Sequence, residues 1–96
     1  MKIGRIVHRG LRQLYEQDSV KGIPAGTADK LRKMLAFLEG MDDAEELHGL
    51  PIWKAHLLGG DRQGTWSLNV TRNWRLTFWI DTDEKLICDL NLEDYH

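Results

Sequence analysis

The stretch TWSLNVTRNWRLTFWI, residues 65–80, decides the fold of this 96-residue chain. Apolar and polar side chains alternate along residues 65–70 and again along residues 74–80, which is the period of a β-strand with one buried face. Only residues 71–73 separate the two runs, so we expect the strands to reverse tightly and pair antiparallel. The side chains predicted to face the core are Trp66, Leu68, Val70, Trp74, Leu76, Phe78 and Ile80.

The same period of two continues on both sides of this hairpin. Residues 52–58 and residues 86–92 alternate in this way, and short turn-like connections join them to the hairpin, which predicts an antiparallel meander. The core-facing side chains predicted in these two runs are Trp53, Ala55, Leu57, Leu86, Cys88, Leu90 and Leu92. The opposite, polar face is predicted to carry Lys54, His56, Ser67, Arg75 and Trp79.

The first half of the chain has the period of helices. Residues 2–7 suit a short strand that leads into a helix over residues 9–17. A second helix is predicted from Pro24, a residue favoured at first helical positions, to Gly40 as its C-cap. Its predicted core face consists of Ala28, Leu31, Met34, Leu35 and Leu38. We therefore expect an α+β fold with two N-terminal helices packed on one face of an antiparallel sheet.

Length and composition fit a single domain over residues 1–96, with 42% hydrophobic residues. No apolar run approaches the length of a membrane-spanning helix, and the basic N-terminus lacks the apolar stretch of a signal peptide. One cysteine, Cys88, cannot form an internal disulfide. A cytoplasmic protein without membrane contact is the expected class.

A net charge of −2 hides strong segregation of charge along the chain. Residues 1–35 carry eight Lys or Arg against three Asp or Glu, and residues 53–80 carry four bases against one acid. The other two segments are acidic: residues 36–52 have five acids and no base, and residues 81–96 have six acids against one base. Only the basic segments suit contact with nucleic acid, and the overall balance counts against a free-standing RNA binder.

Groups suited to proton transfer and anion binding gather in the second half of the chain: His56, Arg75, Asp94, Tyr95 and His96. A base, an acid and a cationic clamp are sufficient for phosphodiester cleavage without a metal. Each group also has a simpler reading. A histidine on a polar sheet face is more often only solvated, an arginine there is more often a cross-strand charge partner, and most chain ends are solvated tails.

Two further observations bear on ligands. Trp79 lies out of phase with the core and suits either stacking on a base or covering a loop. The histidines and the single cysteine are not spaced like metal ligands, so neither a metal nor another cofactor is expected.

Two segments together resemble the HigB group of the RelE superfamily of bacterial toxins. They are HLLGGDRQGTWSLNVTRNWRLTFWI at residues 56–80 and the final LEDYH at residues 92–96. The segment GLRQLYEQDSVKGIPAGTADKLRKMLAFLE at residues 10–39 resembles the helical half of the same group, so the likeness covers nearly the whole chain. The pair Asn73-Trp74-Arg75 and Asp94-Tyr95-His96 is its most specific part.

The resemblance implies a RelE-type fold and a toxin that cleaves mRNA in the ribosomal A site. It also implies a HigA-like helix-turn-helix antitoxin as partner, with DNA contacted only through that antitoxin. The catalytic residues that it implies are His56, Asp94, Tyr95 and His96, with Arg75 facing the phosphate. We add Lys54, Arg62 and Trp79 as further substrate-binding residues.

One loop departs from the family pattern and keeps alternatives open. The family usually has Lys-Gly-Asp-Arg where this chain has Gly59-Gly60-Asp61-Arg62, and we expect Gly59 to take a positive φ there. The loss of a cation favours one alternative, a catalytically weakened homologue that acts as co-repressor with its antitoxin. The other alternative is a ParE-like toxin that binds gyrase without chemistry, which would not need the terminal Asp94-Tyr95-His96.

Overall fold

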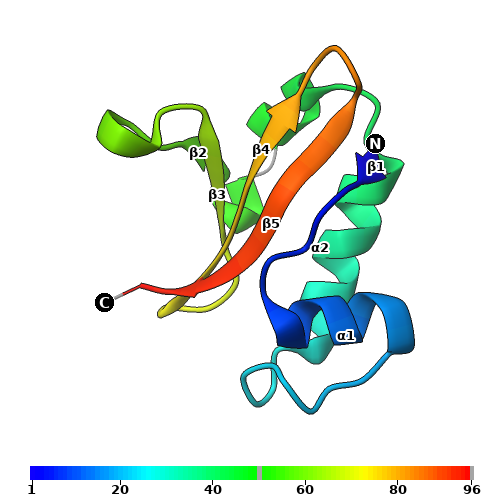
Figure 1. Ribbon diagram of the computed structural model, residues 1–96. Coiled ribbons are helices and arrows are strands. Elements are labelled where there is room, and N and C mark those ends of the chain that lie inside the picture. The colour runs from blue at the N-terminus through cyan, green and yellow to red at the C-terminus, as the bar shows by residue number, and fades with distance from the viewer. Residues whose placement is uncertain (50, 96) are drawn as a thin grey trace.

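The computed structural model describes residues 1–49 and 51–95, and in this part of the chain five strands form one sheet in the order β1-β5-β4-β3-β2. β1 pairs parallel with β5, and the other neighbours pair antiparallel (Figure 1). The elements in chain order are β1 (Lys2–Ile3), α1 (Arg9–Gln17), α2 (Ala28–Gly40), the 3-10 helices η1 (Ala44–Gly49) and η2 (Pro51–Trp53), β2 (His56–Leu57), the 3-10 helix η3 (Gly60–Arg62), β3 (Thr65–Asn69), β4 (Trp74–Asp81) and β5 (Leu86–Asp94).

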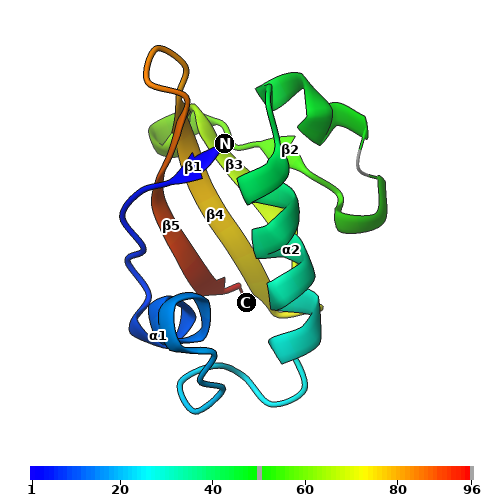
Figure 2. The same ribbon diagram turned by 90° about the vertical axis from the view of Figure 1, so that its right-hand side faces the viewer.

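Both long helices cover the same face of the sheet, as predicted (Figure 2). The core between the two layers contains Leu11 and Leu14 of α1, four residues of α2, and the inward side chains of β3, β4 and β5. The α2 residues are Leu31, Met34, Leu35 and Leu38. None of the helices in the described residues is long and apolar enough to cross a membrane.

The first helix has the predicted bounds because a side chain caps its start and a left-handed backbone conformation ends it. Nδ1 of His8 accepts a hydrogen bond from the Leu11 amide at 3.0 Å and serves as the N-cap. Asp18 takes a left-handed conformation with φ of 56° and ends the helix.

The second helix begins later than predicted, at Ala28 instead of Pro24. The hydroxyl of Thr27 donates to the Pro24 carbonyl at 2.7 Å, so the residues between them form a turn that leads into the helix. Thr27 is 3% exposed, and its burial fixes the turn against the core.

The hairpin of β3 and β4 is confirmed in register and facing. Leu68 lies opposite Leu76, and Trp66 lies opposite Phe78. These four side chains are at most 6% exposed. Partners in an antiparallel pair share a face, so one register buries both apolar sets.

The strand predicted over residues 52–58 is wrong in most of its length. Residues Pro51–Trp53 form a 3-10 turn, Lys54 has a positive φ of 49°, and only His56–Leu57 pair with β3. The ring of Trp53 packs edge-on against Phe37 of α2, with 5.6 Å between the ring centroids. The apolar residues that suggested a strand therefore reach the core partly through a helical turn, and Leu57 is 51% exposed.

The last strand exists, but the predicted facing of its first half is wrong. The register of β5 against β4 shifts between Thr77 and Trp79, where Asp89 has a positive φ of 51°. Such a bulge inserts one residue and reverses the alternation on one side of it. Ile87 is therefore fully buried, whereas Cys88 is only half-buried and lies opposite Trp79.

We expect Gly10→Ala to destabilise the protein. A Cβ at Gly10 would lie 1.8 Å from the carbonyl oxygen of Gly22, so the first turn of α1 and the following loop would have to separate. Overpacking of this kind costs about 1–3 kcal/mol or more in the free energy of unfolding, measurable by chemical denaturation.

Gly40→Ala is the matched control, because a Cβ at the end of α2 would meet nothing within 4 Å. Alanine is the better helix former, so this variant should be neutral or slightly more stable. Equal stability of the two variants would contradict the close packing of Gly10 on Gly22.

Candidate functional site

The sheet face turned away from the helices carries the candidate residues, and the strand registers establish which side chains share it. His56 is the partner of Ser67, which is the partner of Thr77, so the three project from one face. Arg75 and Trp79 lie two residues to either side of Thr77 and share that face by alternation. The predicted facing of His56, Ser67, Arg75 and Trp79 is therefore confirmed.

His56 lies on β2, at the edge of the sheet, with its imidazole tied to the preceding turn. Its Nδ1 is 2.9 Å from the carbonyl oxygen of Lys54, which orients the ring. Three strand spacings, roughly 14 Å, separate the backbone of β2 from that of β5. The structure does not place Lys54 on this face by strand pairing, because it precedes β2 in the turn.

Arg75 and Tyr95 meet at one corner of the face. The guanidinium carbon of Arg75 lies 5.3 Å from the centroid of the Tyr95 ring, a cation–π contact. Nη1 of Arg75 also donates to the carbonyls of Thr71 at 2.7 Å, Trp74 at 3.1 Å and Arg72 at 3.2 Å. Arg75 thus holds the β3–β4 turn and supports the tyrosine ring at the same time.

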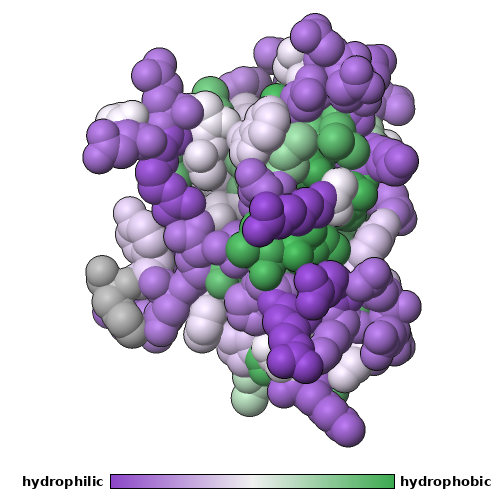
Figure 3. Space-filling model, in the orientation of Figure 1, coloured by the Kyte–Doolittle hydropathy of each residue, from purple (hydrophilic) through white to green (hydrophobic). Residues whose placement is uncertain are grey.

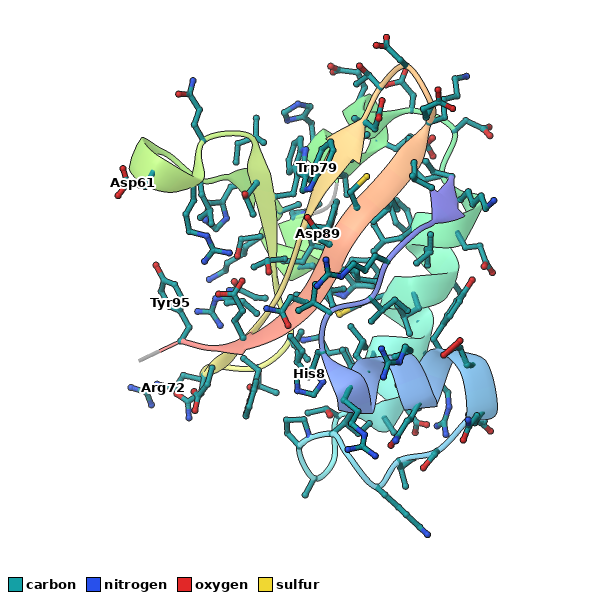
Figure 4. All side chains as sticks on the ribbon, viewed as in Figure 1. His8, Asp61, Arg72, Trp79, Asp89 and Tyr95 are labelled. Atoms are coloured by element: carbon teal, nitrogen blue, oxygen red, sulfur yellow. The ribbon has the colours of Figure 1, made fainter. Side chains whose placement is uncertain are left out.

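The end of the described chain is fixed by the sheet. β5 continues to Asp94, opposite Trp74, and the Tyr95 amide donates to the Asn73 carbonyl at 2.5 Å. Tyr95 is nevertheless 56% exposed, and Figure 4 shows its side chain pointing away from the helical layer, toward the side where Asp61 lies. The register places Asp94 on the face of Trp74, the opposite of the face of Arg75. His96 lies outside the described residues.

Arg62 forms a two-pronged ion pair above the same face. Its Nη1 donates to Oε1 of Glu93 at 2.9 Å, and its Nη2 to Oε2 at 2.5 Å. Thr77, 3% exposed, donates its hydroxyl to the same carboxylate. The hydrogen bonds from Arg62, and secondarily from Thr77, lower the pKa of Glu93, and the bond to Glu93 raises the pKa of Arg62. The arginine predicted to meet substrate is thus already paired with a carboxylate.

A cavity of about 230 Å³ lies on this face beside the ion pair. Arg62 and Glu93 form one end of it, and Trp79 and Asp89 contribute at another. The indole N–H of Trp79 donates to Oδ2 of Asp89 at 2.9 Å, and Figure 4 shows the two residues adjacent on β4 and β5. Trp79 is 42% exposed, so the predicted outward position is confirmed.

In the loop that lacks the family lysine, the backbone conformation of the glycines differs from the one predicted. Gly59 has an ordinary φ of −105°, so the predicted positive φ is wrong there. The positive values belong to Gly60, at 61°, and Gly64, at 91°. A Cβ at Gly59 would meet nothing within 4 Å. The backbone therefore accommodates a lysine at this position without strain.

Sequence reasoning missed Glu93, Thr77 and Asp89 as parts of the site. Glu93 lies opposite Arg75, and the alternation of side chains along the strands could have predicted that it faces the polar side of the sheet. Its pairing with Arg62 depends on the conformation of a loop 31 residues earlier, which periodicity does not report. Within residues 1–49 and 51–95, no three His, Cys, Asp or Glu side chains are grouped so that they could hold a metal ion.

Comparison with known proteins found similarities of sequence and of structure. The endoribonuclease HigB of Proteus vulgaris is 39% identical over 89 residues, which are 93% of this chain and 94% of the relative. The crystal structure of YafQ from E. coli superposes with a TM-score of 0.59 at 15% identity, covering 97% of this chain and 89% of YafQ, and shares the fold. The RelBE2 toxin–antitoxin complex of Mycobacterium tuberculosis gives a TM-score of 0.48 at 20% identity, over 99% of this chain and 96% of the matched chain.

The family match covers almost the entire sequence. The family model described as a RelE-like toxin of the type II toxin–antitoxin system HigB matches residues 5–96. With the relative from Proteus vulgaris, this match shows that the chain belongs to the HigB family of RelE-like toxins of type II toxin–antitoxin systems.

Proposed function

We propose that this toxin is an endoribonuclease that cuts mRNA in the ribosomal A site. The observation that carries the proposal is the corner where Arg75 supports the exposed Tyr95 ring on the face that also bears His56. The relative from Proteus vulgaris, named an endoribonuclease, supports the same reaction class. A guanidinium, a phenol and an imidazole on one sheet face suit a phosphodiester better than a purely protein-binding surface.

In the proposed reaction, the 2′-hydroxyl of the RNA attacks the adjacent phosphorus in line. A base removes the proton of that hydroxyl, an acid protonates the departing 5′-oxygen, and Arg75 stabilises the charge on the phosphoryl oxygens. His56 and His96 suit the proton transfers because imidazole exchanges protons near neutral pH. Tyr95 positions the phosphate or a base. Asp94 lies on the face opposite Arg75, so the role proposed for it is to orient an imidazole and not to meet the 2′-hydroxyl directly.

The ribosome is the proposed scaffold for this chemistry. A net charge of −2 gives little attraction to free RNA, and the Arg62 charge is further offset by Glu93. His56 and Tyr95 lie at opposite sides of the face, so an mRNA held in a fixed conformation is needed to meet both. We expect the protein to act in the cytoplasm, where ribosomes translate mRNA.

The partners follow from the family and the charge pattern. As a type II toxin the protein acts with an antitoxin. We propose a HigA-like helix-turn-helix protein for this role, with DNA contacted through that antitoxin alone.

The proposal is tested by in vitro translation of a defined mRNA followed by primer extension. We expect cuts within the A-site codon when ribosomes are present, little cleavage of naked mRNA, and no loss of cleavage with EDTA. The products should carry a 2′,3′-cyclic phosphate or 3′-phosphate, because the 2′-hydroxyl is the nucleophile. Metal-dependent products with 3′-hydroxyl ends would contradict the mechanism, and intact mRNA with inhibited gyrase would favour a ParE-like toxin.

Deleting Tyr95 and His96 should reduce ribosome-dependent cleavage at least about 100-fold, because it removes candidate proton-transfer and positioning groups. The thermal midpoint should change little, since Tyr95 is more than half exposed and lies beyond the last buried residue, Leu92. Cleavage near the parental rate by the shortened protein would assign the chemistry to other residues.

Glu93→Gln should lower stability at pH 7, by less than about 1 kcal/mol because Arg62 is nearly half exposed. The pKa of Glu93 is depressed in the folded protein, so its contribution is present above the ordinary value near 4.5 and is lost as pH falls through the folded value. The difference in unfolding free energy between variant and parent should therefore shrink as the pH falls below 4.5.

Chemical denaturation at pH 7 and pH 3 measures this difference. Glu84→Gln, a change of the same charge in the exposed β4–β5 turn, serves as control. A stability difference for Glu93→Gln that persists unchanged at pH 3 would mean that packing, not the ion pair, gives Glu93 its effect.

A further inference from the structure

The cavity beside Trp79 is not used by the reaction proposed above. It opens on the polar sheet face and is lined by Trp79, Asp89, Asn91 and Thr65, with the Arg62–Glu93 pair at its other end. Its volume of about 230 Å³ is below the roughly 300–1,000 Å³ of pockets that hold drug-sized ligands. A cavity of this size suits one planar ring system.

Trp79 is placed for stacking. It lies on β4, a central strand, with 42% of the residue exposed, although most large apolar side chains of the central strands are buried. Its only polar atom already donates to Asp89 at 2.9 Å, which holds the orientation of the indole. A fixed, exposed indole offers an aromatic surface to a flat ligand at little cost in side-chain entropy.

Asp89 supplies the hydrogen-bonding edge. Asp89 has a positive φ of 51° and lies at the bulge in β5. The bulge interrupts the alternation of side chains along the strand and turns this side chain toward Trp79. A carboxylate accepts about four hydrogen bonds, so the indole N–H leaves capacity for a further donor. Asp and Glu accept from the exocyclic amino group of cytosine in known nucleic-acid contacts, whereas the carbonyl at the matching position of uracil has no proton to donate.

The surroundings favour a base over a phosphate. Asp89 and Glu93 place two carboxylates at the cavity, and Arg62 is already paired with one of them. Figure 3 shows patches of hydrophobic surface among hydrophilic side chains on the side viewed. In the cavity itself the lining is largely polar, and Val7 and Trp79, each 42% exposed, are its exposed apolar members. The two carboxylates disfavour an anion, whereas an exposed indole beside a hydrogen-bond acceptor suits a neutral base.

We propose that this cavity is a nucleobase subsite: Trp79 stacks on a base that carries an exocyclic amino group, and Asp89 accepts a hydrogen bond from that group. The assignment rests on the proposed function for the source of the base, an mRNA strand. Trp79 lies four residues from Arg75 along β4, about 13 Å. The base therefore belongs to a nucleotide next to the one whose phosphate meets Arg75, and the subsite determines sequence preference without taking part in the chemistry.

The test uses binding, so it does not depend on cleavage. The full-length ¹⁵N-labelled protein is titrated with CMP, AMP, UMP and ribose 5-phosphate while the indole N–H signals are followed by NMR. Trp79→Phe assigns the Trp79 signal by its loss. We expect CMP and AMP to shift that signal with dissociation constants of about 1–10 mM, the range for a single weakly held base. UMP should bind at least about 5-fold more weakly, and ribose 5-phosphate should leave the signal unmoved.

Asp89→Asn is the matched variant, because asparagine adopts positive φ as readily as aspartate and keeps the bulge. Its amide both accepts and donates, so the preference for CMP over UMP should fall about 5-fold or more. An unmoved Trp79 signal, equal shifts with UMP, an equal effect of ribose 5-phosphate, or unchanged preference in Asp89→Asn would overturn the assignment. A protein that binds CMP in this way but cuts no mRNA on ribosomes would refute the proposed function and leave the subsite standing.

Discussion

The ladder between β4 and β5 is the constraint on which the rest of the structure depends. It pairs Leu76 with Leu92 on the helix side and Arg75 with Glu93 on the other side, so one register forms both the core and the polar face. The backbone bond from Tyr95 to Asn73 extends the same ladder past the end of β5. A slip by one residue would bury the charges and expose the leucines, so selection for the core also preserves the site.

The sequence predicted the fold class and the β3–β4 hairpin because their signals are local. Leu68 and Leu76 alternate with polar residues over an uninterrupted pairing, and the α1 bounds follow from the period of the helix. The alternation failed where the backbone departs from regular geometry. Pro51 opens a 3-10 turn in place of a strand, and Asp89 inserts a bulge that no count of apolar residues detects.

In the candidate site, too, the local features could be predicted from the sequence and the long-range contacts could not. The shared face of His56, Arg75 and Trp79 could be read from the phase of their strands, which depends on their own neighbours in sequence. The pairing of Arg62 with Glu93 could not be predicted from the sequence, because it joins a loop to a strand 31 residues later. Because a carboxylate already holds Arg62, this arginine must exchange Glu93 for a phosphate before it can bind RNA.

The position of β5 within the sheet determines when the toxin can fold during its synthesis. This strand lies between β1 and β4, so residues Lys2–Ile3 have no strand partner until residues 86 and 87 have left the ribosome. Helices α1 and α2 likewise lack the β5 side chains of their core until then. Folding therefore completes only after β5 is synthesised, and a chain that terminates before β5 lacks the partner strand of β1 and part of the core.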